Sequence, residues 1–348
     1  MKIAIIGAGM MGSALAFPAR ENGNDVRIVG TPLDREIIDT CKRTNRHPKF
    51  DLYFPAGITY YQIEDVLTAI KDVDFVICGV SSFGVDWFGD EIFPLLPEGL
   101  PILSVTKGLL DTEDGRLLTY PQVWQSKLDR QGKQLCLNAI GGACTSYELA
   151  SHDHSHVTFC GPDATVLHML KQAMATDYYH ISLSHDVTGV ESAVALKNGY
   201  GLGLCLTVGL NILECGPKAP QRYNSQAAIF AEATREMRDL LAMQGAPDFH
   251  NLMVGIGDMY VTVYGGRTRI IGTLLGKGLD IDEARAQLQG VTLESLVVAE
   301  RVARALRVRA ARGEVNLADF PLLMHIDDII TKKAPVSIPW DRFTFEAL

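Results

Sequence analysis

The first twelve residues constrain the fold of this chain more than any other segment. An apolar run at Ile3–Ile6 leads directly into the pattern G-x-G-x-x-G, and a helix is predicted from Ser13 onward. A strand, a tight glycine turn and a helix in this order are typical of a dinucleotide-binding βαβ unit, because the glycines let the turn form and let a pyrophosphate approach the backbone at the helix N-terminus. We therefore predict a Rossmann-type domain that binds a nicotinamide dinucleotide. The loop residues expected to contact it are Gly7, Gly9, Met10, Met11 and Gly12.

The rest of the first half alternates short apolar runs with amphipathic segments, which predicts a largely parallel sheet of seven or eight strands. After Asp186 the strand signal fades and the spacing of apolar residues favours helices. We predict an α/β Rossmann-type domain at residues 1–187, an all-helical domain at 188–348, and an irregular tail at 334–348. The predicted strands are 3–6, 26–29, 73–80, 101–105, 134–140, 156–160 and 178–183, and the predicted helices are 13–21, 35–43, 187–213, 225–244, 281–287, 293–311 and 322–330.

Composition and charge exclude several classes of partner. A formal net charge of −9 provides no broad basic face for nucleic acid or an anionic membrane. Seven scattered cysteines without a C-x-x-C pair argue against a disulfide framework and a structural zinc. The first apolar run begins at Ile3, which leaves no room for a signal peptide, and the long apolar stretch Ala193–Leu213 is interrupted by polar residues, as in a buried core helix. We expect a cytoplasmic protein that binds neither nucleic acid nor membrane.

The strand at 26–29 ends without the carboxylate that usually binds the ribose hydroxyls of NAD. The chain continues Gly-Thr-Pro-Leu-Asp-Arg from Gly30, and Thr31 and Arg35 are suited to a ribose 2′-phosphate instead. NADP is therefore as well supported as NAD, although Arg35 is also compatible with a solvated first-turn residue.

Two lysines have positions that suggest a role in ligand binding or catalysis. Lys107 follows the strand at 101–105, at the carboxyl edge where ligands of such sheets bind, although a lysine there is also compatible with a solvated loop. Lys197 and Asn198 interrupt an apolar helix. Burial lowers the pKa of a lysine toward neutrality, which suits proton exchange with a carbonyl or alcohol oxygen, unless the side chain reaches solvent by snorkelling.

Two further segments carry polar groups. Asp258 and Thr262 are four residues apart, so they share one face if this segment is helical. Arg267 and Arg269 follow two glycines and resemble an anion fork, with a plain basic turn as the alternative. The histidines at 152, 154 and 156 would share one strand face, but the polar run 151–156 favours a loop, and we predict no metal site.

Together these motifs resemble the NAD(P)-dependent glycerol-3-phosphate dehydrogenases of the 6-phosphogluconate-dehydrogenase-like superfamily. The resemblance spans nearly the whole chain, and the order and spacing of its pieces are more specific than any single piece. They are GAGMMG at 7–12, TKGL at 106–109, GACTSYELA at 142–150, GVESAVALKN at 189–198, GIGDMYVT at 255–262, GGRTR at 265–269 and LLGKG at 274–278.

The resemblance implies a role for each matching residue. Lys197 matches the catalytic acid/base, Lys107 matches a lysine that contacts the substrate, and Asp258 matches a residue that completes the catalytic site. Further substrate contacts are implied for Asn198, Gly142, Cys144, Thr262, Arg267 and Thr268, and further cofactor contacts for Ser146, Arg267 and Glu294. The implied reaction is reversible reduction of dihydroxyacetone phosphate to sn-glycerol 3-phosphate by NADH or NADPH, in an enzyme expected to be a homodimer.

Three departures from the family pattern bear on the substrate. Thr268 replaces an asparagine, Cys144 replaces a polar residue, and Ser295 replaces a glycine. A dehydrogenase of the same architecture acting on another polyol phosphate or a hydroxy acid is therefore a second hypothesis. A dinucleotide-binding sensor without catalysis is a third, although such a protein would have no need of the substrate lysines.

Overall fold

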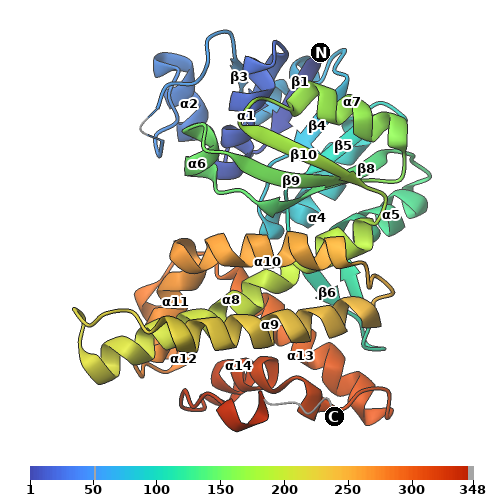
Figure 1. The fold of residues 1–348 in the computed structure, drawn as a ribbon. Helices are drawn as coiled ribbons and strands as arrows, with labels where there is room; N and C mark the ends of the chain where they lie inside the picture. The colour runs from blue at the N-terminus through green and yellow to red at the C-terminus, as the bar shows by residue number, and fades with distance from the viewer. Residues whose placement is uncertain (51, 344–348) are drawn as a thin grey trace. The chain divides into compact units, whose positions relative to one another are not determined.

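The computed structural model describes residues 1–50 and 52–343, and the chain divides into two units. Unit 1 comprises residues 1–107 and 120–191, and unit 2 comprises residues 108–119 and 192 onward. Figure 1 shows a sheet flanked by helices in unit 1 and a bundle of helices in unit 2. Each unit is described by itself.

Unit 1 contains an eight-stranded sheet with the order β10-β9-β8-β5-β4-β1-β2-β3. Every neighbouring pair is parallel except β8 and β9, which run antiparallel from Ala139↔Cys160 to Ala143↔His156. The order reverses between β1 and β4, which is the switch point where ligands of doubly wound sheets bind. The strands are β1 (Lys2–Ile6), β2 (Asp25–Val29), β3 (Thr59–Tyr61), β4 (Phe75–Cys78), β5 (Pro101–Ser104), β8 (Cys136–Ala143), β9 (Ser155–Cys160) and β10 (Tyr179–Ser184).

The strands of unit 1 are apolar on both faces, as a covered parallel sheet requires. Ile3 and Ile5 of β1 share one core cluster with Leu15 of α1 and Leu167 of α7, whereas Ala4 is equally buried but lies outside that cluster. Successive side chains of β1 therefore face opposite sides of the sheet. The helices of unit 1 are α1 (Met10–Glu21), α2 (Arg35–Thr44), α3 (Val66–Ala69), α4 (Val85–Trp87), α5 (Tyr120–Gln131), α6 (Ser146–Ala150) and α7 (Ala164–Met174).

Unit 2 is helical apart from one hairpin, β6 (Leu109–Asp111) with β7 (Leu117–Thr119). Its central helix α8 starts at Val187 in unit 1 and ends at Cys215. The most apolar 18-residue window of α8 is long and hydrophobic enough to span a membrane, but 94% of it is buried, as in the core helix of a soluble protein. The other helices are α9 (Tyr223–Met243), α10 (Phe249–Tyr264), α11 (Gly266–Gly276), α12 (Ile281–Gln287), α13 (Glu294–Ala311) and α14 (Pro321–Lys332).

Close packing against α8 depends on glycines. A Cβ on Gly209 of α8 would lie 2.6 Å from the Cα of Gly276 of α11, and a Cβ on Gly272 would lie 2.4 Å from the Cβ of Cys205. The two helix backbones therefore approach closely, and this contact adds to an apolar core that contains Tyr200, Leu206 and Ile271.

The structure confirms the predicted fold class: an α/β Rossmann-type sheet followed by helices. All seven predicted strands are present, and β3 is the eighth strand of the sheet. The hairpin at 109–119 and the helices α3, α4, α5, α7, α10 and α11 were not predicted. Residues 334–339 form no regular element, as expected for the tail, and 344–348 lie outside the described residues.

Candidate functional site

The glycine loop between β1 and α1 leaves room for a ligand at one glycine and packs tightly at the other two. Gly7 has φ +110°, and a Cβ on it would lie 2.7 Å from the backbone of Gly79. A Cβ on Gly12 would lie 2.3 Å from the carbonyl oxygen of Gly7, whereas the nearest atom to a Cβ on Gly9 is 3.8 Å away. Gly9 is therefore not required by packing, and the space beside it fits the approach of a pyrophosphate.

Replacing Gly9 by alanine is expected to leave folding intact and to raise the KM for the dinucleotide about tenfold, because the methyl group occupies space that the pyrophosphate needs. Gly12→Ala is the matched variant. It forces a methyl group into the backbone of Gly7 and should lower the free energy of unfolding by about 1–3 kcal/mol. Thermal melts and KM measurements separate the two effects, and a Gly9→Ala variant with normal cofactor KM would contradict our interpretation.

The end of β2 at Val29 carries no carboxylate, as expected, but the carboxylate of Asp34 stands beside the glycine loop. Asp34 Oδ2 accepts hydrogen bonds from the Ala8 N–H at 3.2 Å, the Thr31 N–H at 2.9 Å and the Thr31 hydroxyl at 2.7 Å. The chain turns at Pro32 and Leu33. This turn brings the Asp34 carboxylate back to the glycine loop, although Asp34 does not directly follow the strand. Arg35, the next residue, pairs with Glu64 at the surface.

His47 is a second residue near this loop that sequence reasoning missed. Its imidazole is buried, and Nε2 lies 3.1 Å from the carbonyl oxygen of Ala8. Burial lowers the pKa of His47, so the neutral ring is favoured at this position. No pattern within 45–50 signals this contact, because it joins residues 39 positions apart.

The other predicted residues of unit 1 gather around the ends of β5 and β8. Lys107 Nζ lies 3.5 Å from the carbonyl oxygen of Gly142, a residue with φ +130°. Lys107, Gly142 and Cys144 line one small cavity together with Met11. Ser146 is the first residue of α6, directly after this segment. Unit 1 therefore brings a lysine ammonium close to the glycine loop.

In unit 2, the structure brings Lys197 next to Asp258 and Thr262, which lie more than 60 residues further along the sequence. Lys197 Nζ lies 3.0 Å from Asp258 Oδ1 and donates a hydrogen bond to Thr262 Oγ1 at 2.7 Å. The Thr262 hydroxyl in turn donates to the Asp258 carbonyl oxygen at 2.8 Å, so its oxygen lone pair faces the lysine. The side chains of Lys197 and Asp258 are only 11% and 3% exposed. A buried lysine with an oriented ammonium suits proton transfer to a ligand oxygen.

The neighbouring predicted residues lie on α8, α11 and α13. Asn198 and Thr268 are buried, and a Cβ on Gly201, one turn after Lys197, would contact the methyl groups of both Thr262 and Thr268. Arg267 Nη2 lies 3.6 Å from Glu294 Oε2, so the two residues of this unit that are predicted to contact the cofactor are neighbours.

The predicted anion fork of Arg267 and Arg269 does not form as a pair. Arg269 Nη1 donates to the carbonyl oxygen of Val263 at 2.6 Å and so binds the last turn of α10. Arg267 is the one of the two whose guanidinium faces the predicted site residue Glu294.

The histidine-rich run has structural partners. His152 Nε2 lies 2.9 Å from Glu21 Oε1, and His154 stacks on His180 with the two rings 5.3 Å apart. Within residues 1–50 and 52–343, no group of three or more histidine, cysteine, aspartate or glutamate side chains is arranged to hold a metal ion.

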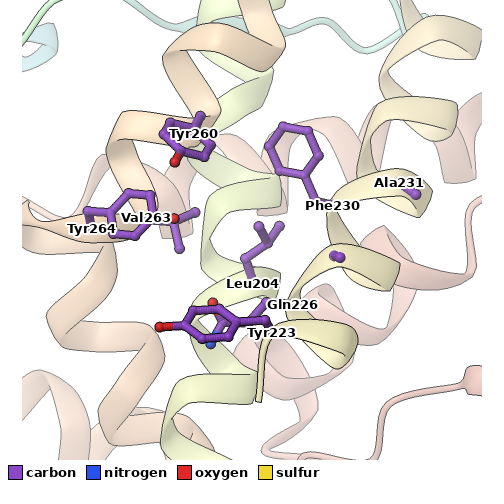
Figure 2. A pocket seen from close by; sticks show the side chains of 9 residues that line it. Leu204, Tyr223, Gln226, Phe230, Ala231, Tyr260, Val263 and Tyr264 are labelled. Carbon is purple, nitrogen blue, oxygen red and sulfur yellow. The ribbon is translucent and has the colours of Figure 1, made fainter. Parts of the chain in front are cut away.

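A separate cavity of about 360 Å³ lies in unit 2 between α8, α9 and α10. Figure 2 shows Tyr260, Tyr264 and Phe230 around Leu204. Tyr260 and Tyr264 face away from Asp258 and Thr262, since residues two apart on a helix point about 200° apart. The lining is apolar and contains no predicted site residue: Leu204, Tyr223, Gln226, Ala227, Phe230, Ala231, Tyr260, Val263 and Tyr264.

Comparisons with known proteins agree across the chain. Residues 2–166 match the family model described as NAD-dependent glycerol-3-phosphate dehydrogenase N-terminus, and residues 186–340 match the corresponding C-terminus. The NADP(+)-dependent glycerol-3-phosphate dehydrogenase of Archaeoglobus fulgidus is 33% identical over 83% of this chain and 84% of its own. The glycerol-3-phosphate dehydrogenase [NAD(P)+] of Enterococcus faecalis is 30% identical over 81% of this chain and 79% of its own.

A solved structure shares the fold at lower identity. The glycerol-3-phosphate dehydrogenase of Plasmodium falciparum has a TM-score of 0.83 and 19% identity over 100% of this chain and 96% of its own.

Proposed function

Because the chain belongs to the NAD-dependent glycerol-3-phosphate dehydrogenase family, we propose that it reversibly reduces dihydroxyacetone phosphate to sn-glycerol 3-phosphate with NADH or NADPH. The observation that carries the proposal is the buried Lys197–Asp258–Thr262 cluster, since reduction of a ketone needs a proton donor held at a fixed place. The bound nicotinamide would supply the hydride to C2 of the substrate.

Lys197 donates the proton to the C2 oxygen as the carbonyl becomes an alcohol. Asp258 holds the ammonium from one side at 3.0 Å, and the Thr262 oxygen accepts one of its hydrogens at 2.7 Å, so the direction of the remaining N–H bonds is restricted. This positioning lowers the entropy cost of bringing donor and substrate oxygen together.

The other residues orient the substrate. Lys107 and Asn198 polarise the C2 oxygen, and Arg267 and Thr268 bind the phosphate, for which a guanidinium is suited by its paired N–H donors. Under this proposal the domain at 1–187 binds the cofactor and the domain at 188–348 supplies the acid/base.

The test measures oxidation of NADH and of NADPH with dihydroxyacetone phosphate, glycerone and a short panel of other phosphorylated ketones and keto acids. We expect turnover only with the phosphorylated ketones and a preference for dihydroxyacetone phosphate. No oxidation of either cofactor with any compound would reject catalysis and favour the sensor.

A second candidate function is reduction of a different ketone phosphate to its polyol phosphate. Cys144 lines the cavity that also contains Lys107, where the family pattern has a more polar side chain. A ketone phosphate with a less polar group beside Cys144 would suit a thiol better, because a thiol forms only weak hydrogen bonds. A higher kcat/KM for such a compound than for dihydroxyacetone phosphate, in the same panel, would select this alternative.

The choice between NADPH and NADH should depend on Arg35. Its partner Glu64 is exposed, and such a surface pair contributes little stability, so Arg35 is available to a 2′-phosphate. We expect Arg35→Ala to raise the KM for NADPH about tenfold and to leave the KM for NADH within about threefold. Glu64→Gln is the control. If it changes either KM, it should lower the KM for NADPH relative to the KM for NADH. Equal changes for both cofactors would contradict the assignment.

We further propose that the protein is a cytoplasmic homodimer. Tyr223, Tyr260 and Tyr264 expose between 57% and 67% of their surface around the cavity of unit 2, and exposed aromatic clusters are frequent in subunit interfaces. Light scattering coupled to size-exclusion chromatography should give twice the chain mass, and a monomer mass at micromolar concentration would reject the proposal.

A further inference from the structure

His47 lies beside the glycine loop, and its neighbours determine which ring nitrogen carries the hydrogen. Nδ1 is 3.1 Å from the backbone nitrogen of Lys49, whose N–H can only donate, so Nδ1 is the acceptor. Nε2 is 3.1 Å from the carbonyl oxygen of Ala8, which can only accept, so Nε2 carries the hydrogen and donates it. The ring is therefore a neutral imidazole that uses both nitrogens, in a residue that is 1% exposed.

Both peptide groups of Ala8 are held by side chains. Its carbonyl oxygen, besides accepting from His47, accepts from the Ser13 hydroxyl at 3.2 Å, and its N–H donates to Asp34 Oδ2 at 3.2 Å. Because a peptide group is planar, fixing the Ala8 carbonyl also fixes the direction of the Gly9 N–H, which points the opposite way. The turn that leads into α1 therefore has a defined orientation before a ligand arrives.

The segment that carries His47 is anchored by contacts of its own. The Phe54 N–H donates to the Asn45 carbonyl oxygen at 2.9 Å, and the Asn45 side-chain amide donates to the Phe54 carbonyl oxygen at 2.7 Å. The Tyr60 hydroxyl of β3 donates to Asn45 Oδ1 at 2.7 Å. These bonds hold the segment in place, so the imidazole meets the glycine loop as a fixed donor.

Filling space does not explain a histidine at this position, because a buried apolar side chain of similar size needs no hydrogen-bond partners. We propose that His47 is a positioning residue of the dinucleotide site, which fixes the glycine loop through the Ala8 carbonyl oxygen. Backbone N–H groups at the start of a helix bind phosphates, and a loop that is already ordered loses less entropy on binding. The inference requires a bound dinucleotide but no particular substrate, so it goes beyond the proposed function.

The test uses two amide variants, each of which keeps one half of the imidazole. The amide nitrogen of glutamine is as many bonds from the backbone as Nε2, so His47→Gln keeps a donor for Ala8 and loses the acceptor for Lys49. The amide oxygen of asparagine corresponds to Nδ1, so His47→Asn keeps the acceptor and loses the donor. Fluorescence of the bound nicotinamide gives the Kd for NADH and NADPH, and Tm, kcat and KM are measured alongside.

We expect His47→Asn to raise both Kd values and the cofactor KM about five- to tenfold, the loss of one hydrogen bond, while kcat at saturating cofactor changes less than about twofold. His47→Gln should keep both Kd values within about twofold of the wild type. Tyr60→Phe is the matched control. It removes a hydrogen bond that anchors the same segment to β3 and not to the glycine loop, and it should leave both Kd values unchanged.

A purely structural role for His47 predicts the reverse order, because the contact with Lys49 shapes the segment itself. His47→Gln would then bind the cofactors as weakly as His47→Asn or more weakly, and this result overturns the inference. Unchanged Kd values in His47→Asn, its failure to fold, or an equal loss of affinity in Tyr60→Phe also overturn it. A wild type that binds the dinucleotide but reduces no ketone would reject only the proposed function, so the two failures are distinguishable.

Discussion

Replacing Lys197 by alanine is expected to lower kcat for dihydroxyacetone phosphate reduction by about 10²–10⁴, because a positioned general acid contributes a factor of this size. The ammonium is held at 3.0 Å from Asp258 and 2.7 Å from Thr262, so neither water nor a displaced side chain reproduces its placement. Steady-state kinetics with the preferred cofactor measure the loss. A kcat within about tenfold of wild type would contradict the assignment of Lys197.

The same substitution also removes the ion-pair partner of the buried Asp258 carboxylate. A control must separate the resulting loss of stability from the loss of the proton donor. Asp258 is 3% exposed at its side chain, so removing Lys197 leaves a carboxylate without its ion-pair partner and should lower Tm. The double variant Lys197→Ala/Asp258→Asn removes the stranded charge. We expect it to recover most of the Tm and none of the kcat. Recovery of both would mean that Lys197 is needed for folding and not for proton transfer.

The fold and the glycine loop could be predicted because they depend on local rules. Alternating strands and helices specify a parallel sheet, and Gly7 is required by a turn that few other residues can form. The cluster of Lys197, Asp258 and Thr262 could also be predicted in part, since the spacing of four residues between Asp258 and Thr262 places these two polar groups on one helical face.

Contacts that only the tertiary fold creates could not be predicted from the sequence in the same way. The segment Phe249–Tyr264 contains two glycines and several β-branched residues, which weakens any helix signal, yet it forms α10. Packing decides the outcome, because Gly255 lies so close to α8 and α9 that a Cβ there would be 2.9 Å from Ala193 and 2.8 Å from Met237. Asp34 was missed because a turn of the chain, and not its position in the sequence, brings it to the glycine loop.

Glu236 illustrates such a tertiary contact with a large expected effect on stability. Its fully buried carboxyl accepts the N–H groups of Leu322 and Leu323 at 2.7 and 3.1 Å and the Tyr200 hydroxyl at 2.9 Å. These two N–H groups begin α14, so an acid on α9 caps a helix that lies 86 residues further along the chain. Glu236→Ala should lower the free energy of unfolding by about 3–5 kcal/mol, since it leaves three buried donors without an acceptor.

Two matched variants test whether the cap, and not merely an acid on α9, carries this stability. Asp239→Ala removes a carboxylate one turn along the same helix, which is 31% exposed and pairs with Arg235 and Arg238, and this should cost less than about 1 kcal/mol. Tyr200→Phe removes only one of the three donors and should cost about 1 kcal/mol. Denaturant titration of the three variants should therefore rank Glu236→Ala far below the other two. Equal costs for Glu236→Ala and Asp239→Ala would show that α14 is held by its apolar face alone.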